Sequence, residues 1–183
     1  MVSDEGLDMR AWVTATTLAV ALTANGLAAA QGSSPSPKPV MLMDSSGNIA
    51  GKPLDETIML VTVASGGVAP ALIRPIYDPD GHTASGLATW QAGGSVLFTS
   101  PDCTAGAHVY GSTHAGVRAT TQVETQGGII LYVGAVGTAS TVAVQSILYD
   151  TGCAPVKVRQ NGLFPVLAIV NLSSTYPPPL SFQ

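Results

Sequence analysis

Short apolar runs, separated by turn-forming residues, make up most of the chain from Val40 onward. The runs are rich in Val, Ile, Leu and Thr, and Gly, Pro, Asn or Asp interrupts them about every ten residues, which is typical of a β-sandwich or barrel. The predicted strands cover residues 40–44, 57–64, 69–77, 87–91, 95–100, 108–112, 118–124, 129–133, 141–149, 156–160 and 164–171. We therefore expect an all-β fold of one domain, an antiparallel β-sandwich or small β-barrel, with short helices at most.

The breaks between these runs have the composition of tight turns. Gly adopts positive φ readily, and Asn and Asp accept hydrogen bonds from the backbone that follows them. The predicted turns cover residues 46–48, 65–67, 78–81, 93–94, 126–128 and 161–162. Segment 141–149 is ambiguous, because it begins with the alternation of a strand but is also compatible with a buried turn of helix.

The N-terminal segment has the pattern of a secretory signal peptide. Arg10 precedes an uncharged apolar run at residues 11–22, and small side chains stand at Ala28 and Ala30, the −3 and −1 positions of a cleavage site. The run is well short of the ~20 residues that span a bilayer. We expect cleavage after Ala30 and a mature protein that is not an integral membrane protein. Because the residues before Met9 are acidic, we expect Met9 rather than Met1 to be the true start.

Four segments follow from these patterns: a signal peptide at 1–30, a Ser/Pro linker at 31–39, a β-domain at 40–175 and a Pro-rich tail at 176–183. The linker cannot build a core and should be extended. The tail should also be extended, because proline fixes φ and has no N–H to donate. We expect Phe182 to pack against the domain.

Charge and hydropathy narrow the classes of function. Only 10% of the residues are charged, against roughly 25% in an ordinary soluble domain. Because 46% of the chain is hydrophobic and the formal net charge is only −4, it should fold rather than stay disordered. Its lysines and arginines are scattered singly, whereas a nucleic-acid binder shows a basic patch. We expect no nucleic-acid partner.

Cys103 and Cys153 are the only two cysteines. An exported chain enters an oxidising compartment, where such a pair usually closes. A redox-active or catalytic thiol would need a nearby second cysteine or a basic setting, and neither is visible. We predict a structural disulfide between the two.

Other residue types do not form a catalytic or metal-binding pattern. His108 and His114 are spaced neither as a helical pair nor as an i, i+2 pair on a strand. Asp78 and Asp80 flank a proline and fit a turn better than a calcium loop, whose other ligands are missing. No serine lies in a Gly-x-Ser-x-Gly elbow. We therefore predict no catalytic residue, no metal and no cofactor.

Two motifs resemble a known group of proteins. Residues 44–51 read Asp-Ser-Ser-Gly-Asn-Ile-Ala-Gly, and residues 100–106 read Ser-Pro-Asp-Cys-Thr-Ala-Gly. With Leu-Tyr-Val at 131–133, the later Cys153 and a Tyr-Pro-Pro-rich end, they resemble a loose group of exported β-rich proteobacterial proteins, some related to the C-terminal parts of phage-tail-like proteins. The resemblance implies export and a β-rich fold, and it implies no activity.

Together these patterns favour an exported protein, periplasmic or extracellular, that is a non-catalytic structural or binding module with a protein or glycan partner. A small secreted hydrolase using His82, His108 or His114 is one alternative, because a fold can assemble a catalytic triad from distant residues. A phage-tail-like or surface assembly component is another. We lean against an enzyme.

Overall fold

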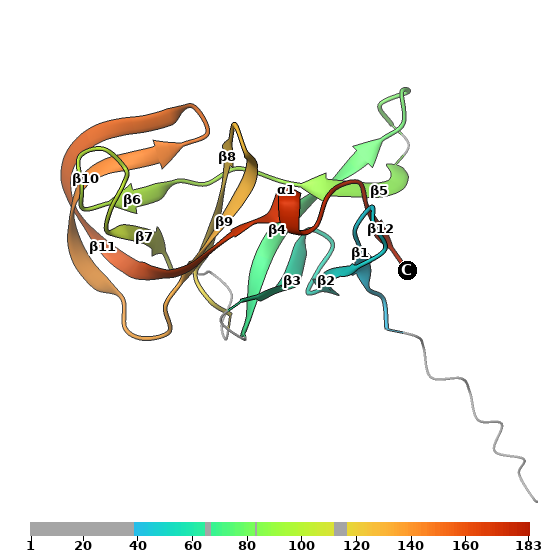
Figure 1. Cartoon of the computed structure of the whole chain (residues 1–183), viewed down its shortest axis with the longest axis horizontal. Coiled ribbons are helices and arrows are strands. Elements are labelled where there is room, and N and C mark those ends of the chain that lie inside the picture. The colour runs from blue at the N-terminus through green and yellow to red at the C-terminus, as the bar shows by residue number, and fades with distance from the viewer. Residues whose placement is uncertain (1–38, 65–66, 83, 112–116) are drawn as a thin grey trace, which may run out of the picture. The chain divides into compact units, whose positions relative to one another are not determined.

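The computed structural model of the chain describes residues 39–64, 67–82, 84–111 and 117–183. Nearly all regular structure in these ranges is antiparallel strand, which confirms the all-β prediction (Figure 1). The strands are β1 (Leu42–Met43), β2 (Ile49–Pro53), β3 (Ile58–Val63), β4 (Gly67–Tyr77), β5 (Ala84–Trp90), β6 (Val96–Phe98), β7 (Ala107–Tyr110), β8 (Thr120–Thr125), β9 (Gly128–Gly134), β10 (Ser140–Tyr149), β11 (Gly152–Asn171) and β12 (Leu180–Phe182). The helix α1 (Leu172–Thr175) is a single turn. No helix in the described ranges is long and apolar enough to cross a bilayer.

Six strands close into an antiparallel barrel in the order β1-β12-β5-β4-β3-β2. Side chains alternate between the two faces of a strand, and on β4 the inward positions Ala69, Ala71 and Ile73 are buried. Met59 on β3 and Leu180 on β12 are also fully buried in the same core. The inward-facing side chains of these strands therefore fill the interior of the barrel.

Asp44 organises the β1–β2 hairpin. Its carboxylate accepts hydrogen bonds from the backbone N–H groups of Ser46 (2.9 Å) and Asn48 (2.8 Å), and from the side-chain amide of Asn48 (3.2 Å). Gly47 completes the reversal at φ 82°, a conformation that costs glycine little. Desolvation alone would raise the pKa of Asp44, but the hydrogen bonds from Asn48, Ser46 and Gly47 outweigh it, so the pKa lies below its usual value.

The C-terminal residues complete the barrel instead of lying outside it. Strand β12 pairs with β1 on one side and with β5 on the other, and Gln183 exchanges two backbone hydrogen bonds with Met41. The expected packing of Phe182 is wrong: Phe182 is 42% exposed, and Leu180 is the buried residue. Because β12 has strand partners on both sides, its backbone N–H and C=O groups are satisfied within the barrel.

The other six strands form a sheet in the order β10-β6-β7-β11-β9-β8, and a further β10–β11 pairing closes β10, β6, β7 and β11 into a ring. Segment 141–149 is a strand in this sheet, within β10. The turn predicted at residues 161–162 is wrong, because β11 runs unbroken for 20 residues. Its pairing passes from β10 to β7 at Leu163, next to Gly162, so the long-range partners override the local turn signal.

The side chain of Gln122 on β8 joins this sheet to the barrel. Its amide accepts a hydrogen bond from the N–H of Leu72 and donates to the carbonyls of Leu72 (3.0 Å) and Gln91 (2.9 Å). The backbone carbonyl of Gln122 in turn accepts hydrogen bonds from the N–H groups of Gly93 (3.3 Å) and Gly94 (3.0 Å). Gln122 is only 3% exposed. One buried amide thus takes a place in the barrel's backbone hydrogen bonding, just beyond the last β4–β5 pair.

Replacing Gln122 with Met should destabilise the protein by about 2 kcal/mol, because the Leu72 N–H and the Gln91 carbonyl lose their partner in a partly buried place. Urea unfolding followed by circular dichroism measures the change. Gln145→Met, at an exposed position of β10, is the matched control and should shift stability by less than about 0.5 kcal/mol. Equal effects of the two variants would contradict the role given to Gln122.

The lowered pKa of Asp44 predicts how its contribution to the stability of the fold depends on pH. A carboxyl whose pKa is depressed by folding stabilises the fold above its unfolded-state pKa of about 3.9, and that contribution is lost as the pH falls through the folded-state pKa. The stability difference between wild type and Asp44→Asn should be widest at neutral pH and should shrink in acid. Urea titrations between pH 2 and 7 test this, and Ser45→Ala in the same turn should give a difference that does not vary with pH.

Candidate functional site

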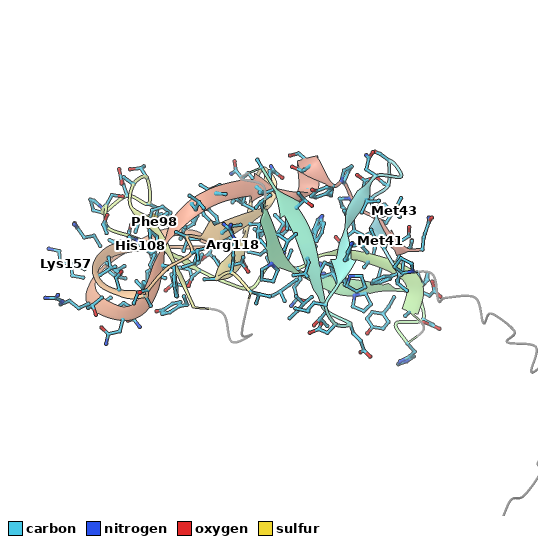
Figure 2. The ribbon with its side chains drawn as sticks, turned by 90° about the horizontal axis from the view of Figure 1, so that it is seen from below. Met41, Met43, Phe98, His108, Arg118 and Lys157 are labelled. Atoms are coloured by element: carbon cyan, nitrogen blue, oxygen red, sulfur yellow. A yellow bond between two sulfur atoms is a disulfide. The ribbon has the colours of Figure 1, made fainter. Side chains whose placement is uncertain are left out.

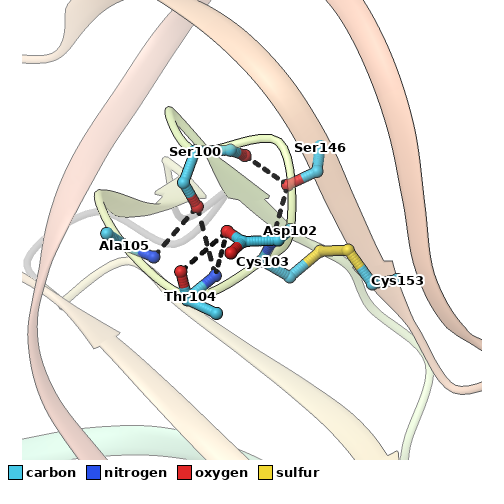
Figure 3. The surroundings of a disulfide bond; sticks show 7 residues. All are labelled: Ser100, Asp102, Cys103, Thr104, Ala105, Ser146 and Cys153. Atoms are coloured by element: carbon cyan, nitrogen blue, oxygen red, sulfur yellow. Dashed lines mark hydrogen bonds between the residues drawn. A yellow bond between two sulfur atoms is a disulfide. The ribbon is translucent and has the colours of Figure 1, made fainter.

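Cys103 and Cys153 form the predicted disulfide, with an S–S distance of 2.08 Å and a Cα–Cα distance of 6.0 Å (Figure 3). Cys103 lies in the corner between β6 and β7 at φ 58°, and Cys153 is the second residue of β11. The bond therefore ties a corner of the ring to the start of its longest strand.

Hydrogen bonds hold the corner in the shape that the disulfide needs. The buried Ser146 hydroxyl accepts the N–H of Cys103 (3.0 Å) and donates to the carbonyl of Ser100 (2.6 Å). The Ser100 hydroxyl accepts two further backbone N–H groups of the corner, those of Thr104 (3.1 Å) and Ala105 (3.0 Å) (Figure 3). The hydroxyl of Thr104, and then that of Ser100, holds the pKa of Asp102 below its usual value. The polar side chains of the 100–106 motif therefore stabilise this corner.

The histidines lie on different elements. His82 is exposed in the turn after β4, where its backbone N–H donates to Asp80 (2.8 Å). His108 lies on β7, and its Nδ1 is 2.8 Å from the carbonyl oxygen of Gly106. Figure 2 shows His108 beside Phe98, at the end of the domain away from Met41. Within the described ranges no group of three or more His, Cys, Asp or Glu side chains could hold a metal.

The other predicted positions fall in two groups. Asp78 and Asp80 form a turn, closed by a 2.8 Å hydrogen bond from the N–H of Gly81 to the carbonyl of Asp78. His114 and the cleavage-site residues Ala28 and Ala30 lie outside the described residues.

A polar cleft of about 380 Å³ lies between the barrel and the sheet. Its lining residues come from several separate parts of the chain: Arg74, Thr89, Trp90, Gln91, Ala92, Glu124, Gly128, Ile129, Asp150 and Ser173. The volume is in the range of small-molecule sites, roughly 300–1,000 Å³. The cleft combines this size with several charged and hydrogen-bonding side chains, and we take it as the candidate functional site.

The barrel supplies one wall of the cleft. Arg74 on β4 and Thr89 on β5 are cross-strand partners and therefore share a face of the barrel sheet. The neighbouring pair, Ile73 and Trp90, is buried in the barrel core. The Trp90 indole N–H donates to the carbonyl of Tyr176 (2.9 Å). The alternation that buries Ile73 thus turns the guanidinium of Arg74 outward at the cleft.

The second sheet and α1 supply the facing wall. Asp150, in the turn between β10 and β11, accepts the backbone N–H of Glu124 at 2.8 Å, which ties that turn to β8. The Ser173 hydroxyl accepts the N–H of Ile129 (2.9 Å). Gly128, at φ 106°, has no room for a side chain, because a Cβ there would lie 2.6 Å from the Cβ of Ser173. The hydrogen bond between the Glu124 N–H and Asp150 therefore fixes the Asp150 carboxylate and the backbone of Glu124 in this wall.

A second hollow, of about 420 Å³, is mainly apolar. It lies between Thr62–Ala64 of the barrel and Ile169–Asn171 of the sheet, with Tyr176 beside it. The Tyr176 hydroxyl donates to the carbonyl of Thr62 (3.2 Å). This hollow offers few polar groups to orient a ligand, so the charged cleft is the better candidate.

Comparisons of the chain with protein-family models, with curated proteins and with solved structures find no match.

Breaking the disulfide should cost about 4 kcal/mol, because the chain-entropy model assigns roughly that much to a closed loop of 50 residues. The double variant Cys103→Ala/Cys153→Ala should unfold at correspondingly lower urea than the oxidised wild type. Wild type kept in reductant is the control and should match the double variant. If reductant leaves the wild-type midpoint unchanged while free thiols appear, the disulfide does not stabilise the fold.

Proposed function

We propose that this chain is an exported, non-catalytic binding module that holds a small polar ligand in the cleft between β4–β5 and the β8–β9 hairpin. The observation that carries the proposal is the cleft itself, a hollow of about 380 Å³ with three charged side chains, Arg74, Glu124 and Asp150, on walls from different parts of the fold. Binding sites of this size use a few well-placed polar groups to orient a ligand.

The construction of the walls supports ligand binding. The backbone of one wall is held by the barrel, and that of the other by the contact between Glu124 and Asp150. The backbone of both walls is therefore fixed before a ligand binds, which limits the ordering entropy that binding costs. The disulfide supports the same reading, because Cys153 follows the Asp150 turn directly and fixes the start of β11.

Export is part of the proposal and rests on the signal pattern at residues 1–30 and on the disulfide, which is typical of proteins in oxidising compartments. Material exported by a bacterium from the full reading frame should therefore begin at Gln31 when its mass is measured. That oxidised material is the protein for the binding test.

The binding test is an NMR titration of the exported protein with a panel of monosaccharides, disaccharides, amino acids and dipeptides. We expect at least one class to shift the amide signals of Gln91, Gly128 and Ile129, with no turnover of the compound. Thr89→Trp should fill the cleft and weaken that binding at least tenfold.

Val136→Trp is the matched control, since Val136 is 80% exposed and lies outside the cleft. It should leave the binding unchanged. Binding that survives Thr89→Trp, or turnover of a panel compound that one side-chain replacement abolishes, would overturn the proposal.

A further inference from the structure

The charges of the cleft are divided between its two walls. Arg74 projects from the barrel, whereas Glu124 and Asp150 belong to the sheet side. A guanidinium is permanently cationic in proteins, and carboxylates accept hydrogen bonds from ammonium and guanidinium groups. The cleft is therefore dipolar, with one cationic and one anionic side.

Arg74 and Glu124 contribute their backbones to strands β4 and β8, but their charged groups have no partner among the described residues. In the described part of the chain, neither side chain makes a hydrogen bond or an ion pair, although both line the same cleft. Asp150 differs, because one of its oxygens, Oδ1, already accepts the N–H of Glu124. Its other oxygen, the Glu124 carboxylate and the Arg74 guanidinium remain for a ligand.

We infer that the cleft binds a small zwitterion, with the anionic group of the ligand against Arg74 and its ammonium group against Glu124 and Asp150. This inference rests on the proposed binding function and names the ligand class. A ligand with a single charge would meet an opposite charge on one wall and a like charge on the other. A zwitterion satisfies both walls and gains charge-assisted hydrogen bonds at each.

The remaining lining groups suit the body of such a ligand. Thr89 and Gln91 also line the cleft and carry hydrogen-bonding side chains. Ala92 and Ile129 add small apolar surface. An amino acid or a dipeptide with free termini carries both charges together with amide and apolar groups, and a neutral sugar carries neither charge.

Three matched probes test the inference: L-alanyl-L-alanine, its N-acetyl derivative and its C-terminal amide. The acetyl group removes the cation and the amide removes the anion, while the body of the probe stays the same. In NMR titrations of the oxidised protein at pH 7 and low salt, the free dipeptide should bind at least tenfold more tightly than either blocked probe.

Two variants assign the charges to the walls. Arg74→Gln should remove the preference for the free carboxylate, so that the dipeptide and its amide bind alike. Glu124→Gln should reduce the preference for the free amine several-fold and leave the preference for the carboxylate intact. Arg159→Gln and Glu56→Gln, which lie outside the cleft, are the matched controls and should change neither preference.

The outcomes separate this inference from the function on which it rests. If methyl glucoside shifts the cleft signals and the dipeptide does not, the zwitterion inference is overturned and the binding function stands. Equal binding of all three probes at the cleft has the same meaning. If no compound of the panel, the dipeptide included, reaches the cleft, both are overturned.

Discussion

The side-chain amide of Gln122, a buried residue, bridges the barrel and the sheet at their joint. Strands β4 and β5 pair as far as Ile73 and Trp90, and beyond that pair the amide of Gln122 bonds the backbone of Leu72 and Gln91. A buried N–H or carbonyl without a partner is costly, and the Gln122 amide supplies both an acceptor and a donor to the backbone groups at this joint. Thr120 adds a second link through its hydroxyl to the carbonyl of Pro70 (2.8 Å).

This joint also protects a strand edge and opens the cleft. Strand β8 lies at the edge of its sheet, and free edges invite association with other chains. Here the backbone carbonyl of Gln122 accepts hydrogen bonds from Gly93 and Gly94, and the Glu124 N–H donates to the Asp150 carboxylate. The same contacts hold β8 beside the barrel, and the cleft is the space that remains beyond them. Edge protection and the candidate site thus share one set of hydrogen bonds.

Local patterns predicted the local features of the structure well. Alternation along β3, β4 and β10 reflects burial on one face of each strand. The disulfide could be predicted because the chain has only two cysteines and such a pair usually closes in an oxidising compartment. Strand β2 was missed, because Gly51 and Lys52 break its apolar pattern. The unbroken course of β11 through Gly162 and the barrel strand β12 were also missed, because both are fixed by strands distant in sequence. The Gln122 side chain bonds residues 31 and 50 positions away, and the Glu124–Asp150 contact at the cleft spans 26 positions. A polar residue in a predicted strand carries no local sign of such a partner.

Two of the few charged side chains of this protein, those of Arg74 and Glu124, lie in the cleft. Only 10% of the chain is charged, so its surface is built mainly from neutral groups, and charged side chains are not needed in number for the fold. Yet the side chains of Arg74 and Glu124 line one hollow and form no hydrogen bond or ion pair with each other or with any other described residue. A surface ion pair would add little stability, and a charged side chain without a partner gains no stability from ion pairing. Hydrogen bonds and ion pairs within the described fold therefore do not account for these two side chains, and the proposed ligand binding rests on them.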